Sequence, residues 1–286
     1  MVRIGIKQWQ LRWFARVGAV SVWMALAIGL TNDATADDAL QFELKLDAPA
    51  AAAAADVGKK PAAPNLDVQF TAFEERLQTE PAPNVIRAAI DLLRTQPTEV
   101  PKEYSTLIES WHTDALTAEP KSLLLRLLYL ELLDVQERQD DLIKYSRKLL
   151  KEEDIVGLQR GMVANNLAYA LTTRGDKKDL PEAEAAMEEA IQAFGPTPDL
   201  LDTRAIVRLA KGDLQDARED LQSAIEARPG SMFYFHLALL EEKAGNRDAV
   251  RAAMQQAIEL KVERNQIPPP ERKAFDRLLK DLDAKK

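Results

Sequence analysis

The sequence contains no cysteine, which excludes disulfide bonds, thiolate nucleophiles, thiolate metal ligands and the lipidated cysteine of a bacterial lipoprotein. Histidine is scarce, with His112 and His236 the two in the chain. His236 is followed by acidic residues at five and six positions, whereas metal ligands that share a helix face are usually three or four apart. We interpret His236 as a packing or groove-lining residue and His112 as a solvated surface residue.

Glycine is limited to 11 of 286 residues, and neither a phosphate-binding glycine loop nor a Gly-x-Ser-x-Gly elbow occurs. Adjacent acidic residues such as Glu188 and Glu189 offer carboxylates, but on an amphipathic helix such pairs are typical of a solvated face. The sequence therefore predicts a protein that is not an enzyme and that has no cofactor, no metal and no small-molecule substrate.

The charge balance is acidic, with a formal net charge of -8. Residues 1–36 carry four basic side chains and one acidic one, so their removal would leave a product near -11. Such a product repels phosphate backbones and anionic lipid headgroups, which argues against nucleic acid or a membrane surface as its main ligand.

The first 36 residues contain, in order, a basic stretch, the apolar run Val17 to Leu30, and the small-residue triplet Ala34-Thr35-Ala36. This order is typical of a secretory signal peptide. The apolar run would extend only about 21 Å as a helix, short of a hydrocarbon core of about 30 Å. We expect cleavage and export to the periplasm or the medium; an uncleaved single-pass membrane anchor is the alternative. An alanine- and proline-rich linker at 37–65 is predicted to be disordered.

From Leu66 onward, apolar residues recur at steps of three and four, and no run alternates as a strand would. The sequence predicts an all-α fold with an N-terminal helical region at 66–118, in which prolines separate the helices. Pro268, Pro269 and Pro270 precede a last amphipathic segment at 268–286, which we expect to form a C-terminal capping helix.

Three segments are similar to one another: Asn165 to Phe194, Asp202 to Arg228 and Phe235 to Leu260. Within each, a Gly-Asp or Gly-Asn pair separates two amphipathic stretches, and spaced alanines recur in the second stretch. Alanine lets helix backbones approach closely, and glycine can adopt the left-handed conformation that ends a helix.

At these residues the chain resembles the tetratricopeptide repeat family. The resemblance implies tandem antiparallel helix-pair repeats stacked as a right-handed α-solenoid over 119–262, with repeats at 161–195, 197–230 and 231–262 and a degenerate one at about 119–155. Arg204 and Val250 depart from the family pattern, which puts their local packing in question.

The first helices of such repeats line a concave groove that takes extended or helical peptides. If the family geometry holds, the candidate groove residues are Asn165, Asn166, Tyr169, Asp202, Ile206, Phe235 and Leu239. The alternative is that neighbouring helices cover these residues, and the sequence does not decide between the two. We expect an exported interaction scaffold that binds a protein or peptide partner; a membrane-anchored structural component of a cell-envelope complex and an enzyme subunit are the other hypotheses.

Overall fold

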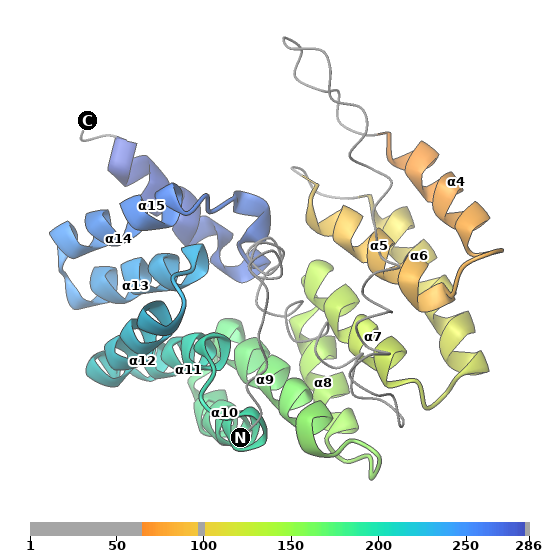
Figure 1. The fold of residues 1–286 in the computed structure, drawn as a ribbon, viewed down its shortest axis with the longest axis horizontal. Helices are drawn as coiled ribbons and strands as arrows, with labels where there is room; N and C mark the ends of the chain where they lie inside the picture. The colour runs from red at the N-terminus through yellow and green to blue at the C-terminus, as the bar shows by residue number, and fades with distance from the viewer. Residues whose placement is uncertain (1–64, 97–100, 284–286) are drawn as a thin grey trace.

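The computed structural model describes residues 65–96 and 101–283, and over these ranges it contains helices and no strand, which confirms the all-α prediction (Figure 1). The predicted signal peptide at 1–36 and the linker up to residue 64 lie outside the described residues. None of the described helices combines the length and hydrophobicity that crossing a bilayer requires.

The helices follow one another with short connections. In chain order they are α4 (Leu66–Arg76), α5 (Ala82–Arg94), α6 (Lys102–Ala118), α7 (Leu123–Val135), α8 (Gln139–Leu149), α9 (Gly157–Arg174), α10 (Leu180–Phe194), α11 (Pro198–Lys211), α12 (Leu214–Ala227), α13 (Ser231–Ala244), α14 (Arg247–Glu259) and α15 (Arg272–Asp283), with 3-10 turns η1 (Lys177–Asp179), η2 (Arg264–Gln266) and η3 (Pro269–Glu271).

Adjacent helices pack in pairs, most extensively α9 with α10, α11 with α12 and α13 with α14. The first helix of each pair ends at a glycine in the left-handed region, with φ of 81° at Gly175, 96° at Gly212 and 81° at Gly245. A side chain at these positions would clash with its own backbone, so the conformation favours glycine. The turns are thus formed by the glycines that occupy equivalent positions in the three similar segments of the sequence.

Close packing within a pair depends on small side chains. Ala183 and Ala217 are buried in the first turn of α10 and α12, Ala253 is buried in the middle of α14, and the later alanines Ala190, Ala224 and Ala257 are also buried. Helices α9 and α10 approach closely at Gly161 in α9, where an added Cβ atom would lie 2.6 Å from the Cβ of Ala193. The helix axes are therefore as close there as their side chains allow.

Arg204 occupies a position where the repeat pattern has an apolar residue, and the structure shows how it is accommodated. Its Nε and Nη2 donate to the Asp220 carboxylate at 2.9 and 2.6 Å, and Arg208 donates to the same carboxylate at 2.5 Å. A buried acid on α12 thus pairs with two arginines on α11, so the local packing is satisfied by charge and not by apolar contact.

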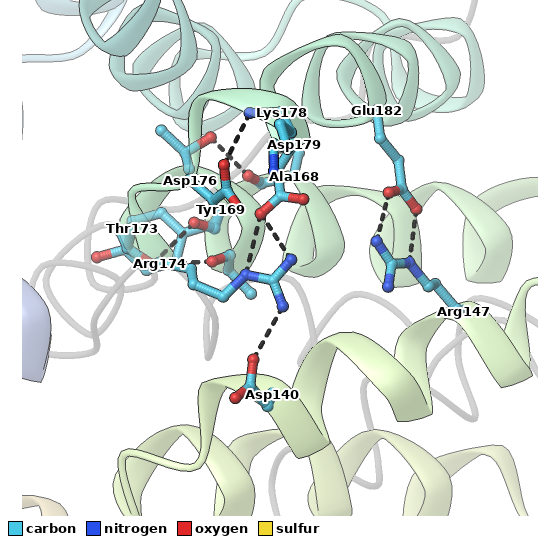
Figure 2. A network of polar contacts seen from close by, with 12 residues as sticks. Asp140, Arg147, Ala168, Tyr169, Thr173, Arg174, Asp176, Lys178, Asp179 and Glu182 are labelled. Atoms are coloured by element: carbon cyan, nitrogen blue, oxygen red, sulfur yellow. Dashed lines mark hydrogen bonds and ion pairs between the residues drawn. The ribbon is translucent and has the colours of Figure 1, made fainter.

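Ion pairs join α8 to the α9–α10 pair that follows it (Figure 2). Arg174, at the end of α9, donates to Asp140 on α8 at 2.9 Å and to Asp179 in η1 at 2.6 Å. Arg147 on α8 makes a two-pronged contact with Glu182 on α10. Helix α8 therefore packs against α9 and is joined to α10 by an ion pair.

The N-terminal helices and the C-terminal segment lie at opposite ends of the molecule, with α9 and α11 between them (Figure 1). Helix α5 packs against α6 and α7, and α15 packs against α14. The C-terminal segment also returns along the molecule, because η3 contacts α9. Phe275 on α15 meets Phe235 on α13 edge to face, with ring centroids 5.5 Å apart. This return places residues 264–273 beside the first helices of the three regular pairs.

Candidate functional site

A cavity of about 920 Å³ lies between the two ends of the molecule. One wall comes from the start of α6 and the end of α7, and the opposite wall comes from residues 264–269, 272 and 273. The base is formed by one face of α9, α11 and α13 in succession. The first helices of the three regular pairs therefore share one concave surface, which segments from both ends of the described chain enclose.

Four of the predicted groove residues line this cavity: Asn165 and Tyr169 from α9, and Asp202 and Ile206 from α11. Each pair lies four residues apart, so both members project from the same side of their helix. Asn166, the neighbour of Asn165, is half-buried and is not among the lining residues.

In α13 the residues that face the cavity differ from the predicted groove residues Phe235 and Leu239. Met232 and His236 line the cavity, whereas Phe235 is completely buried and Leu239 packs partly buried against the same apolar cluster. The physical reason is α15, whose Phe275 packs on Phe235. The prediction that Phe235 and Leu239 line the groove is therefore wrong, and the alternative that neighbouring helices cover them is correct.

His236 joins three elements at the base of the cavity. Its Nδ1 lies 2.7 Å from Oδ1 of Asp202 on α11, and its Nε2 lies 3.1 Å from Oε2 of Glu271 in η3. All three side chains are buried, with exposed fractions of 3% for His236, 2% for Asp202 and 8% for Glu271. A protonated imidazole donates to both carboxylates at once.

The charge state of this network follows from its surroundings. Burial lowers the pKa of His236, but the charges of Asp202 and Glu271 outweigh it and raise the pKa to about 10. Burial also raises the pKa of Asp202, against the opposing effect of His236. At neutral pH we therefore assign an imidazolium between two carboxylates, which fixes η3 against α11 and α13.

Beside the network, two polar atoms of α9 are buried without a hydrogen-bond partner: Oδ1 of Asn165 and the hydroxyl of Tyr169. Asn165 is 5% exposed. Burial raises the pKa of Tyr169 well above its usual value, and the nearby carboxylates of Glu271 and Asp134 raise it further. The Glu271 carboxylate also raises this pKa as a side-chain hydrogen-bond partner of the hydroxyl, although the two groups fall outside strict hydrogen-bond geometry.

Charged side chains of both signs surround the mouth of the cavity. Arg138 pairs with Glu109 and with Asp141, and Arg264 pairs with Asp276 at 2.9 Å. Most of this charge is therefore neutralised locally. At Asp134, at the end of α7, burial raises the pKa of the carboxyl group against the opposing charges of Arg94 and Arg272.

No protein-family model matches this chain, and no curated protein is significantly similar to it in sequence. The function has to be argued from the cavity and the helices that form it. Among residues 65–96 and 101–283, no group of three histidine or acidic side chains has the arrangement of a metal site.

His112 is placed differently from the prediction, which put it on the surface. It is 3% exposed, its Nε2 lies 2.8 Å from the carbonyl oxygen of Leu125, and its ring stacks on Tyr129. The surface interpretation is therefore wrong, because an imidazole with one satisfied nitrogen can fill an interhelical space as an aromatic residue does.

The sequence reasoning also missed Glu271 and Asp134 as residues of the site. Glu271 lies outside the repeats, and its contact with His236 depends on the return of the C-terminal segment. For His236 the repeat period gave no signal: Asp202 and His236 are 34 residues apart, whereas equivalent residues of α11 and α13 are 33 apart. The residue equivalent to Asp202 is Phe235, which the structure buries.

Proposed function

We propose that the chain is an exported interaction scaffold of the tetratricopeptide repeat type, which binds a peptide segment or a helix of a partner protein on the concave face of a right-handed α-solenoid. Export is inferred from the basic, apolar and small-residue order of residues 1–36. The repeat architecture is inferred from the aligned segments and from the three equivalent glycine turns.

The observation that carries the proposal is the cavity shared by α9, α11 and α13. Its volume of about 920 Å³ lies at the upper end of the range of about 300–1,000 Å³ typical of ligand sites. This space suits a short segment of chain, whereas a folded domain would not enter it. In helix-pair arrays, each pair contacts its neighbours and the concave side is the extended binding surface.

The contacts between first helices support the same architecture. Helix α11 contacts both α9 and α13, and α10 and α12 make the connections to the next pair. The turns repeat in detail, since the N–H of Asp213 donates to Arg208 and the N–H of Asn246 donates to Glu241, each at 2.9 Å and 33 residues apart. Equivalent turns place successive first helices side by side, as a solenoid requires.

The proposal is tested by site-specific photo-crosslinking in the cell that makes the full chain. A photoreactive residue at Thr106, which is exposed and lines the cavity, should give a crosslinked partner band. The matched control is Thr113, exposed on the same helix but outside the cavity lining. Equal crosslinking from both positions would exclude the cavity as the binding surface.

Export is tested separately by mass spectrometry of the mature N-terminus. A chain that begins at Asp37 supports a cleaved signal. A chain that retains residues 1–36 supports the membrane-anchored alternative.

A further inference from the structure

We propose that residues 263–283, which we call the strap, form an autoinhibitory segment: the strap covers the α13 end of the concave surface and is displaced when a partner binds. This inference rests on the proposed function and states how the partner gains access to that surface. It follows from what the strap covers, from how it is attached, and from the charges that meet where it contacts α13.

The strap covers the apolar part of the concave surface. Phe275 packs edge to face on Phe235 of α13, with ring centroids 5.5 Å apart, and both rings belong to one buried cluster against which Leu239 packs. The residues that α13 leaves to the cavity are Met232 and His236. The strap therefore occupies the place where apolar side chains of a partner would pack, and apolar contact is the main source of binding free energy.

The strap is held by its side chains and not by its main chain. In the described chain, the main-chain hydrogen bonds of residues 263–271 stay within the strap. The polar contacts that reach α13 come from side chains: Glu271 lies 3.1 Å from His236, and Arg277 donates to Glu242 at 2.6 Å. Release of the strap therefore breaks no main-chain hydrogen bond of the helix pairs.

The charges at this contact also permit release. With His236 protonated, one cation lies between two buried carboxylates, Asp202 and Glu271, so the group has one negative charge in excess. If the strap leaves, water solvates Glu271, and Asp202 and His236 remain as a bonded pair 2.7 Å apart. Breaking a buried ion pair is costly when it leaves an unpaired charge behind, and here none is left. The displacing partner is therefore a segment whose own acidic side chain takes the place of Glu271.

Two features raise the free energy of the docked strap. Oδ1 of Asn265 is buried without a hydrogen-bond partner in the described chain. Lys261, at the joint between α14 and the strap, has φ of 60°, in the left-handed region that residues other than glycine rarely adopt. Release lets Asn265 bond to water and lets Lys261 leave this conformation, so both features favour a strap that can be displaced.

The first experiment measures release without a ligand. Because the chain has no cysteine, a single introduced thiol reports the exposure of its own site. Leu278→Cys places it on the buried face of the strap, and Leu221→Cys, the matched control, places it in the core of α12. At equal global stability, checked by urea denaturation, a thiol reagent should modify Leu278→Cys about tenfold faster or more, because the strap opens locally. Equal rates would overturn the proposal.

The second experiment tests whether the strap binds as a ligand does. The probe is a fluorescein-labelled peptide of residues 263–286, titrated into the full chain in fluorescence anisotropy. The variant Glu271→Ala/Phe275→Ala, whose own strap lacks two anchors, should bind the probe about tenfold more tightly or better than wild type, where the tethered strap competes at high effective concentration. Lys280→Ala, exposed on the same helix, is the control and should behave as wild type. Equal affinity in variant and wild type, or binding to neither, would overturn the proposal.

The third experiment separates this inference from the proposed function. With a photoreactive residue at Thr106, the crosslinked partner band should be several-fold stronger in the Glu271→Ala/Phe275→Ala background. A band of unchanged intensity would refute autoinhibition while the scaffold proposal stands. The absence of a band from both backgrounds would overturn the proposed function, and with it the inhibitory role, even if the strap opens and rebinds.

Discussion

Replacement of His236 by leucine should destabilise the protein strongly, because it removes the cation between two buried carboxylates. Leucine fills much of the space of the imidazole but cannot donate to Asp202 or Glu271. The rise in the pKa of His236 from 6.5 to about 10 corresponds to about 5 kcal/mol. Burial raises the pKa of Asp202, which offsets part of this. We therefore expect a loss of about 3–5 kcal/mol, the range for breaking a buried pair.

The pH dependence has a definite sign. Since the pKa of His236 is higher in the folded protein than in the unfolded chain, its contribution is fully present below about pH 6.5. The contribution is lost as the pH rises through the folded pKa of about 10. The difference in stability between wild type and His236→Leu should therefore be largest near pH 6 and should shrink towards pH 10.

The assay is urea denaturation followed by circular dichroism at pH 6, 8 and 10. In thermal melts, the same loss corresponds to a decrease of roughly 6–20 °C for a chain of this size. His112→Leu is the control: burial lowers the pKa of His112, so its effect on stability changes in the opposite direction and at lower pH. The charge assignment would be refuted if the free energy of unfolding of His236→Leu lay within about 1 kcal/mol of the wild-type value, which is the cost of an average substitution. A difference between the two proteins that stays constant across this pH range would refute it as well.

Three other substitutions test the packing that positions the cavity. Phe235→Ala should lower the free energy of unfolding by about 3–5 kcal/mol in urea denaturation, since the ring is fully buried against Phe275. The control Ile258→Ala, at an exposed site, should change it by no more than about 0.5 kcal/mol. Equal losses in the two variants would contradict the placement of Phe235 in the core. Gly161→Ala should cost about 1–3 kcal/mol, because its Cβ would meet Ala193, and an unchanged melting curve would show that α9 and α10 are less closely packed.

The sequence was sufficient to predict the helical class, the pairing of helices and the glycine turns, because these depend on local signals. Apolar periodicity and left-handed glycines act within a few residues, and Gly175, Gly212 and Gly245 occur where the sequence comparison places them. The cavity-facing residues Asn165, Tyr169, Asp202 and Ile206 of α9 and α11 followed from the alignment of the repeats, because equivalent positions of neighbouring first helices face the same side.

The face of α13 could not be predicted, because its sequence is apolar on nearly every side. Adjacent residues on a helix differ by about 100° in direction, so a change of one residue exchanges a core position with a cavity position. The burial of Phe235 and the position of His236 at the base of the cavity depend on α15 and η3, which are distant in the sequence. Contacts between segments so far apart in the sequence leave no trace in the apolar periodicity of α13.

The contact of η3 with α9 has a consequence for how this protein can change over time. Arrays of helix pairs can gain or lose a repeat by duplication or deletion, because each unit meets only its neighbours. Here an extra pair inserted between α9 and α13 would carry the C-terminal segment one unit further from α9 and would separate the two walls of the cavity. The number of helix pairs is therefore constrained by the cavity itself, and under the proposed function new specificity would arise by substitution within the cavity and not by lengthening the stack.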